Sequence, residues 1–120
     1  MIHMTALRLI SLPTHAVFEM AGGLALMAAP FVLGFSAAGL VAAVVVGALV
    51  VGLALSAATA DGSGLPIAAH FAFDRGIAFG LLGGALVLGL AGDEAAAAVF
   101  AAMSLGQAAL NVTTRYTARA

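Results

Sequence analysis

Four long apolar segments, separated by short breaks, constrain this chain more than any other feature of its sequence. They run approximately over residues 16–35, 40–58, 71–91 and 95–112. Each segment has about the 20 residues that a helix needs to cross about 30 Å of hydrocarbon. Because lipid offers no partners for backbone N–H and C=O groups, segments of this length cross it as helices. The sequence therefore predicts an all-α fold, a four-helix transmembrane bundle.

The composition excludes the soluble classes of protein. Hydrophobic residues make up 64% of the 120 residues and charged residues only 8%, whereas soluble domains have about 45–50% and 25%. A net charge of −1 without a basic block excludes a nucleic-acid partner. The absence of cysteine excludes disulfides and thiolate metal sites. Since the chain also lacks a phosphate-binding loop and a nucleophile elbow, we predict a lipid-embedded protein that is not an enzyme.

One membrane domain is expected over residues 1–120, because the length suits a single domain. The only clear loop covers residues 59–66, which are polar and rich in turn formers. It separates a first unit of about 12–58 from a second unit of about 65–112. In the second unit, Asp93 is placed to cap the N-terminus of the fourth helix.

The positive charges indicate an orientation in the membrane. With four spans, all of the basic residues fall on one face of the bilayer: Arg8, Arg75, Arg115 and Arg119. The opposite face has only the turn at residues 36–39 and the acidic pair Asp93 and Glu94. The positive-inside rule then places both termini in the cytoplasm, with four spans in a bacterial inner membrane.

The two halves of the chain are similar to each other. A shift of 55 residues aligns His15 with His70 and Glu19 with Asp74, together with several apolar positions. This pattern predicts a duplicated two-helix hairpin. Because each unit has two spans, the two repeats are expected to be parallel and related by an axis along the membrane normal.

Residues 22–36, which read GGLALMAAPFVLGFS, resemble the SPW-repeat family of small bacterial and archaeal membrane proteins. Units of that family carry two helices and a Ser-Pro-Trp tripeptide before a Val-Leu-Gly-Phe-like stretch. Here Ala29, Pro30 and Phe31 stand at the tripeptide position, and neither unit has the tryptophan. The resemblance implies a multi-pass membrane protein and no established activity.

The repeated polar pairs are the candidate ligand or proton site. His15 and Glu19 are four residues apart on one helical face, and His70 and Asp74 repeat that spacing. Parallel repeats would start both helices at the same membrane surface, where the four side chains can meet. Two imidazoles and two carboxylates suffice for Zn, Mn or Fe, and the histidines alone could ligate haem b. A carboxylate beside a histidine could also relay protons for coupled transport of a small solute.

A structural interpretation of the same residues is the main expectation. Acidic groups near a helix N-terminus are favourable and cost little at the interface, where Arg75 is available as a charge partner for Glu19 or Asp74. The protein is then expected to bind no cofactor and to serve a structural role, as a homo-oligomer or with other membrane proteins. The alternative is a metal-binding, haem-binding or proton-coupled transport protein.

Helix packing is expected to depend on small residues and on a few polar side chains. Gly76, Gly80 and Gly84 form a ridge at four-residue spacing that predicts close approach of a neighbouring helix. In the fourth segment, three polar residues at helical spacing are expected to hydrogen-bond to a neighbour: Ser104, Gln107 and Asn111.

Overall fold

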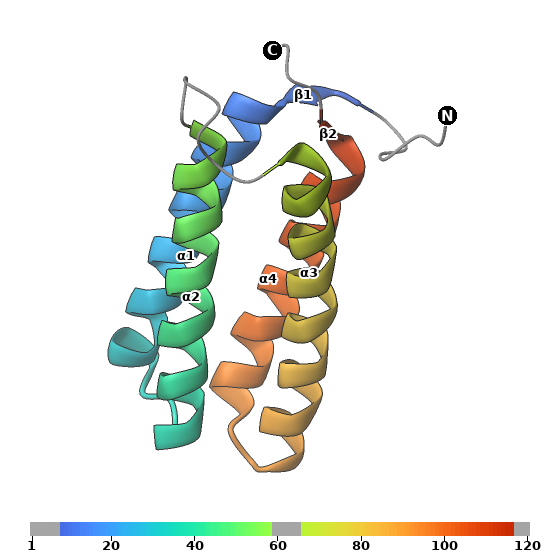
Figure 1. The fold of residues 1–120 in the computed structure, drawn as a ribbon. Coiled ribbons are helices and arrows are strands. Elements are labelled where there is room, and N and C mark those ends of the chain that lie inside the picture. The colour runs from blue at the N-terminus through green and yellow to red at the C-terminus, as the bar shows by residue number, and fades with distance from the viewer. Residues whose placement is uncertain (1–7, 59–65, 117–120) are drawn as a thin grey trace.

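The computed structural model describes residues 8–58 and 66–116. In these ranges the chain forms four helices, shown in Figure 1: α1 (Leu12–Leu33), α2 (Ala37–Ala58), α3 (Ile67–Leu90) and α4 (Glu94–Thr113). Each is long and apolar enough to cross a membrane. The prediction of an all-α, four-helix bundle is therefore confirmed, and the four apolar helices fit a small membrane protein. The parallel-repeat relationship and the single-domain boundaries stay predictions, and the loop at residues 59–65 lies outside the described residues.

The first helix begins about four residues earlier than the apolar pattern alone indicates. Ser11 is the N-cap of α1, and its hydroxyl oxygen accepts a hydrogen bond from the Thr14 amide at 3.3 Å. Pro13 lies in the first turn, where its missing N–H costs nothing. Capping residues thus extend the helix beyond the hydrophobic segment.

The helices are arranged as two hairpins. Helix α1 packs along α2 and α3 packs along α4, whereas the contacts between the two pairs are few. The backbones of α1 and α2 approach closely at two glycines. A Cβ atom on Gly23 would lie 2.9 Å from the Gly47 carbonyl oxygen, and one on Gly47 would lie 2.8 Å from the Gly23 carbonyl oxygen. Only glycine permits this approach, which is typical of helix pairs in lipid.

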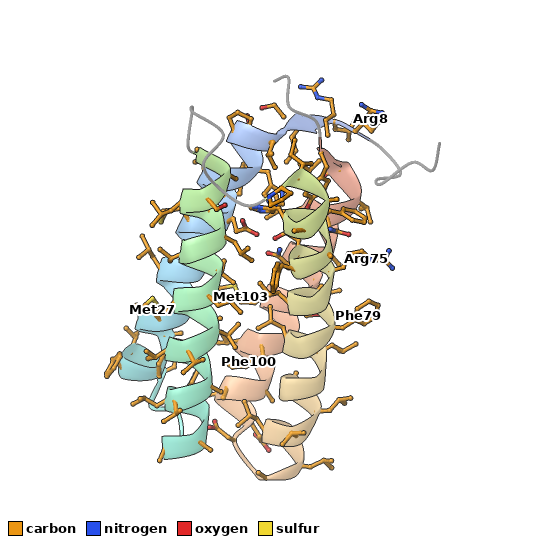
Figure 2. The ribbon with its side chains drawn as sticks, in the orientation of Figure 1. Arg8, Met27, Arg75, Phe79, Phe100 and Met103 are labelled. Carbon is orange, nitrogen blue, oxygen red and sulfur yellow. The ribbon has the colours of Figure 1, made fainter. Side chains whose placement is uncertain are left out.

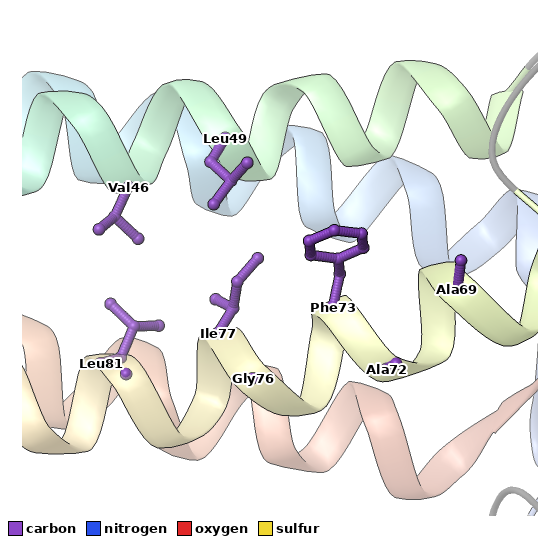
Figure 3. A pocket seen from close by; sticks show the side chains of 9 residues that line it. Val46, Leu49, Ala69, Ala72, Phe73, Gly76, Ile77 and Leu81 are labelled. Atoms are coloured by element: carbon purple, nitrogen blue, oxygen red, sulfur yellow. The ribbon is translucent and has the colours of Figure 1, made fainter.

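The structure corrects the expected glycine ridge on α3. Gly84 meets the Phe100 ring, with its virtual Cβ 2.9 Å from Cδ2, but Gly76 and Gly80 have no atom within 4 Å of theirs. Instead, Gly76 and Gly80 line an open groove of about 520 Å³ between α3 and α2, shown in Figure 3. The three glycines lie on one helix, as their spacing predicts. However, the face of α3 that carries Gly76 and Gly80 borders the groove and does not touch a neighbouring helix at these two glycines.

Opposite ends of the bundle carry different connections between the hairpins. At one end, Asp93 accepts hydrogen bonds from the Ser36 amide at 2.8 Å and from the Ala96 amide at 3.1 Å, so it is the expected cap of α4 and also links the two turns. Hydrogen bonds from Ser36, and then from Ala96, lower the pKa of the Asp93 carboxyl.

At the other end, two short strands pair in parallel: β1 (Ile10–Ser11) and β2 (Thr114–Arg115). Both ends of the described chain therefore lie at this end of the bundle, where α1 and α3 also begin (Figure 1). We call it the terminal end.

The interior between these ends is apolar. Its core is built from buried side chains of all four helices: Leu26, Ala43, Val50, Leu53, Ile77, Leu81, Ala85, Leu88, Ala96 and Phe100. Many other large apolar side chains point outward, and among them Phe31, Val32 and Leu90 are 71%, 79% and 91% exposed. Figure 2 shows such side chains projecting along the length of the bundle. An outer surface of this kind suits a bilayer.

The close approach at Gly47 can be tested with a matched pair of substitutions. We expect Gly47→Ala to lower the free energy of unfolding by about 1–3 kcal/mol, because the added methyl group meets the Gly23 carbonyl oxygen. Gly52→Ala in the same helix is the control, since nothing lies within 4 Å of its Cβ position. The measurement is SDS-induced unfolding in mild detergent. Equal effects of the two substitutions would contradict the assigned α1–α2 contact.

Candidate metal centre

The four residues of the repeated polar pairs lie together inside the bundle. His15 and Glu19 are on successive turns near the start of α1, and His70 and Asp74 take the same places in α3. Their side chains are 0%, 1%, 1% and 0% exposed, in that order. One potential ligand atom from each lies within 4.8 Å of all the others. The structure thus places these residues in the protein interior rather than at an unpaired position on the lipid-facing surface.

The distances within this His/acid cluster resemble those of a tetrahedral metal site. His15 Nε2 is 3.3 Å from Glu19 Oε2 and 3.0 Å from Asp74 Oδ2. His70 Nε2 is 3.2 Å from Glu19 Oε1 and 3.3 Å from Asp74 Oδ2. Around a tetrahedral ion with bonds of 2.0–2.1 Å, neighbouring ligand atoms are about 3.3 Å apart. The four His–acid distances are therefore close to the spacing that such an ion requires, with each histidine facing a different oxygen of Glu19.

The hydrogen-bond network assigns the tautomer of His15. The hydroxyl of Thr114 donates its single hydrogen to the Leu110 carbonyl oxygen at 2.5 Å. The same oxygen is 2.7 Å from His15 Nδ1, so it accepts there and Nδ1 carries a hydrogen. In the neutral imidazole this leaves a lone pair on Nε2.

That lone pair faces the carboxylates. Among the described residues, His15 Nε2 has no hydrogen-bond partner of suitable geometry, and neither has Asp74 Oδ1. A nitrogen lone pair beside two carboxylates is repulsive, and buried polar atoms without partners are costly. A positive charge at the centre of the cluster removes this repulsion and gives His15 Nε2 a partner.

Charge balance indicates how much positive charge is needed. Glu19 and Asp74 together carry two negative charges when ionised, and both are buried in a medium of low dielectric constant. Two protons, one on each imidazole, would neutralise them. A single divalent cation bound to two neutral imidazoles would do the same.

Additional polar residues orient the ligands from outside the cluster. Gln107 donates to Glu19 Oε2 at 3.1 Å, and the Tyr116 hydroxyl donates to Asp74 Oδ2 at 2.6 Å. Asn111 donates in turn to the Tyr116 oxygen at 3.2 Å. Burial, and then the hydrogen bond to Asp74, raise the pKa of Tyr116 above its usual range, so its hydroxyl keeps its hydrogen. Metal-bound carboxylates are commonly fixed in this way.

Two of the three polar residues of α4 bond to neighbouring helices as their spacing predicts: Gln107 donates to Glu19 of α1, and Ser104 donates to the Ala78 carbonyl oxygen of α3 at 2.7 Å. Asn111 instead donates to Tyr116, which follows α4 in the chain. Thr114 and Tyr116 were not identified from the sequence because they follow the last apolar segment. The one available signal was that Tyr116 is the only tyrosine of the chain.

Arg75 lies outside the cluster. Its side chain is exposed, with the guanidinium carbon 5.7 Å from the centre of the Phe71 ring. Within residues 8–58 and 66–116, the ion pairs of Glu19 and Asp74 are with the two histidines. The imidazoles, and not Arg75, are thus the groups available to balance the acids.

Comparisons with known proteins found no matching family model, curated protein or solved structure. The resemblance to the SPW-repeat family stays a prediction, and the function is inferred from the site.

The tautomer assignment predicts a difference between two adjacent threonines. Thr114→Val leaves the buried His15 Nδ1–H without its acceptor, so we expect the free energy of unfolding to fall by about 1–3 kcal/mol. Thr113→Val is the control, because that hydroxyl donates to the Ala109 carbonyl oxygen of its own helix. SDS-induced unfolding measures both. An effect of Thr114→Val no larger than that of the control would show that the Thr114–His15 hydrogen bond is unimportant.

Proposed function

We propose that this chain is a small membrane protein that binds one divalent transition-metal ion between His15, Glu19, His70 and Asp74. The observation that carries the proposal is the burial of two imidazoles and two carboxylates, with each imidazole Nε2 at 3.0–3.3 Å from an oxygen of both acids. Nitrogen and oxygen donors without sulfur suit Zn²⁺, Mn²⁺ or Fe²⁺. A set of four protein ligands, two imidazoles and two carboxylates, favours Zn²⁺ among these.

The ion would join the two hairpins. His15 and Glu19 come from the first hairpin and His70 and Asp74 from the second, and the hairpins otherwise share few contacts. Metal binding would therefore contribute directly to the stability of the assembled bundle. Four protein ligands around one ion are typical of a structural site, whereas catalytic zinc keeps an open position. The proposal combines the expected structural role with the alternative of a metal site and agrees with the expectation of a non-enzyme.

The geometry supports a metal ion better than haem. An axial pair of histidines must leave room for a porphyrin between the two imidazole nitrogens. Here carboxylate oxygens of Glu19 and Asp74 lie within 3.3 Å of those nitrogens. Without a metal, the Nε2 atom of each histidine would carry a hydrogen, and metal binding would displace these two hydrogens.

The metal proposal is tested by zinc stoichiometry. We expect one Zn²⁺ per chain in purified protein that has been stripped with chelator and reloaded. Replacing both acids (Glu19→Gln with Asp74→Asn) should abolish binding, whereas Glu94→Gln should not, since Glu94 lies at the opposite end of the bundle. Because protons compete for the same nitrogens, the affinity should fall by up to about 100-fold per pH unit between pH 8 and pH 6.

Elemental analysis gives the stoichiometry, and circular dichroism checks that each variant is folded. Loading with Zn²⁺ should also raise the midpoint of SDS-induced unfolding of the original protein but not of the double variant. A folded original protein that binds no divalent metal, or a double variant that retains it, would contradict the proposal.

We also propose that the terminal end faces the cytoplasm of a bacterial cell. Arg8, Arg75 and Arg115 lie toward this end, and Figure 2 labels the first two. Asp93 and Glu94 lie at the other end. This distribution follows the positive-inside rule. Association with further copies, or with other membrane proteins, stays a prediction.

Cysteine labelling tests this orientation, because the chain has no cysteine of its own. Leu9 is 68% exposed at the terminal end, and Ala91 is exposed at the opposite end. In intact bacterial cells, a membrane-impermeant maleimide should label Ala91→Cys and not Leu9→Cys, and after lysis it should label both. The reverse pattern would place the terminal end outside the cytoplasm.

A further inference from the structure

A second candidate site lies along the seam between the hairpins. Helices α1 and α4 enclose a cleft of about 460 Å³, which we call the α1–α4 cleft. Much of its wall is apolar, including Phe18, Leu26 and Leu110. Gly22 and Gly106 line it from opposite helices, and neither has an atom within 4 Å of its Cβ position. The cleft has the size of a small-molecule site and is widened where the two helices lack side chains.

Two buried polar side chains also line this cleft. Glu19 is 1% exposed and Gln107 is 6% exposed. Both carboxylate oxygens of Glu19 are engaged, Oε1 with His70 and Oε2 with Gln107. Gln107 uses one N–H for that bond, and within the described residues its carbonyl oxygen and its second N–H have no partner. Gln107 therefore leaves one acceptor and one donor for a ligand.

The unpaired carbonyl oxygen and N–H of Gln107 determine which polar group of a ligand can bind in the cleft. A hydroxyl group both donates and accepts, so it can pair with either the free oxygen or the free N–H of the amide. The negative charges of Glu19 and Asp74 are already balanced, either by protons on the two histidines or by a bound metal ion. A charged head would add an unbalanced charge at low dielectric, so an uncharged head is favoured.

The walls define the rest of the ligand. Phe18 is 57% exposed beside the cleft, on a surface that faces lipid in a membrane-spanning bundle. An apolar tail could enter sideways from the bilayer and lie along these walls. By contrast, the groove between α2 and α3 in Figure 3 has only apolar lining residues, so nothing there selects a ligand.

We propose that the α1–α4 cleft binds a lipophilic alcohol or phenol whose hydroxyl group hydrogen-bonds to the Gln107 amide. This inference goes beyond the metal site and does not require it, because the recognising groups belong to Gln107 and to the apolar walls. The ligand class is an uncharged, hydroxylated amphiphile that partitions into membranes.

The test compares two probes that differ only in the head. Radiolabelled 4-nonylphenol and nonylbenzene are titrated into the protein in lipid nanodiscs, with empty nanodiscs correcting for partition. We expect saturable binding of nonylphenol, about tenfold tighter than that of nonylbenzene because of the hydrogen bonds to Gln107. Gln107→Leu should reduce the affinity for nonylphenol to that for nonylbenzene.

Filling the cleft gives an independent variant. Gly106→Leu should abolish binding of both probes, since its side chain projects into the open space of the cleft. Gly52→Leu is the matched control and should bind normally, because Gly52 is equally unobstructed and lies outside the cleft. Equal affinity for the two probes, absence of saturable binding, or normal binding by Gly106→Leu would overturn the inference.

Zinc content measured on the same samples separates the two proposals. A protein that holds zinc but does not bind nonylphenol overturns the cleft inference alone. A protein that binds nonylphenol as expected but holds no divalent metal overturns the metal proposal alone.

Discussion

The electrostatic balance of two buried carboxylates by two histidines is the interaction on which the arrangement of the two hairpins depends. In water, apolar faces would drive the hairpins together, but in lipid the hydrocarbon solvates those faces as well as a neighbouring helix does. The close backbone contact at Gly23 and Gly47 holds α1 to α2 within one hairpin. Between hairpins, apolar packing in the core is supplemented by polar contacts at both ends, with the His/acid cluster at one and Asp93 at the other.

The position of the polar contacts explains why the candidate metal site and the α1–α4 cleft lie in the same region. A polar cluster can be buried only if its charge is neutralised, which makes it a natural place for a cation. The seam between α1 and α4 is incompletely filled beside Gly22 and Gly106, so the α1–α4 cleft reaches Glu19 and Gln107. The proposed metal site would thus use Glu19, and the proposed ligand site would use Gln107, which donates to that carboxylate.

The sequence predicts most of the fold because each membrane span is determined by one continuous segment of the chain. Length, hydropathy and capping residues determine the helices, and the spacing of His15 and Glu19 places both on one face. Burial of those faces depends on how the hairpins pack, which the linear pattern does not contain. For the same reason Gly76 and Gly80 were assigned to a helix contact that the structure gives to Gly23 and Gly47. Thr114 and Tyr116 reach the cluster only because β2 turns back over the helix ends.

The proposed metal centre requires that the four side chains surround a single divalent cation. X-ray absorption spectroscopy of zinc-loaded protein in detergent tests it most directly, because it reports the ligands of the bound ion. We predict four nitrogen or oxygen ligands at about 2.0 Å, with the outer-shell scattering of two imidazoles. An octahedral shell without imidazole scattering would mean that zinc binds elsewhere and that the four side chains do not hold it.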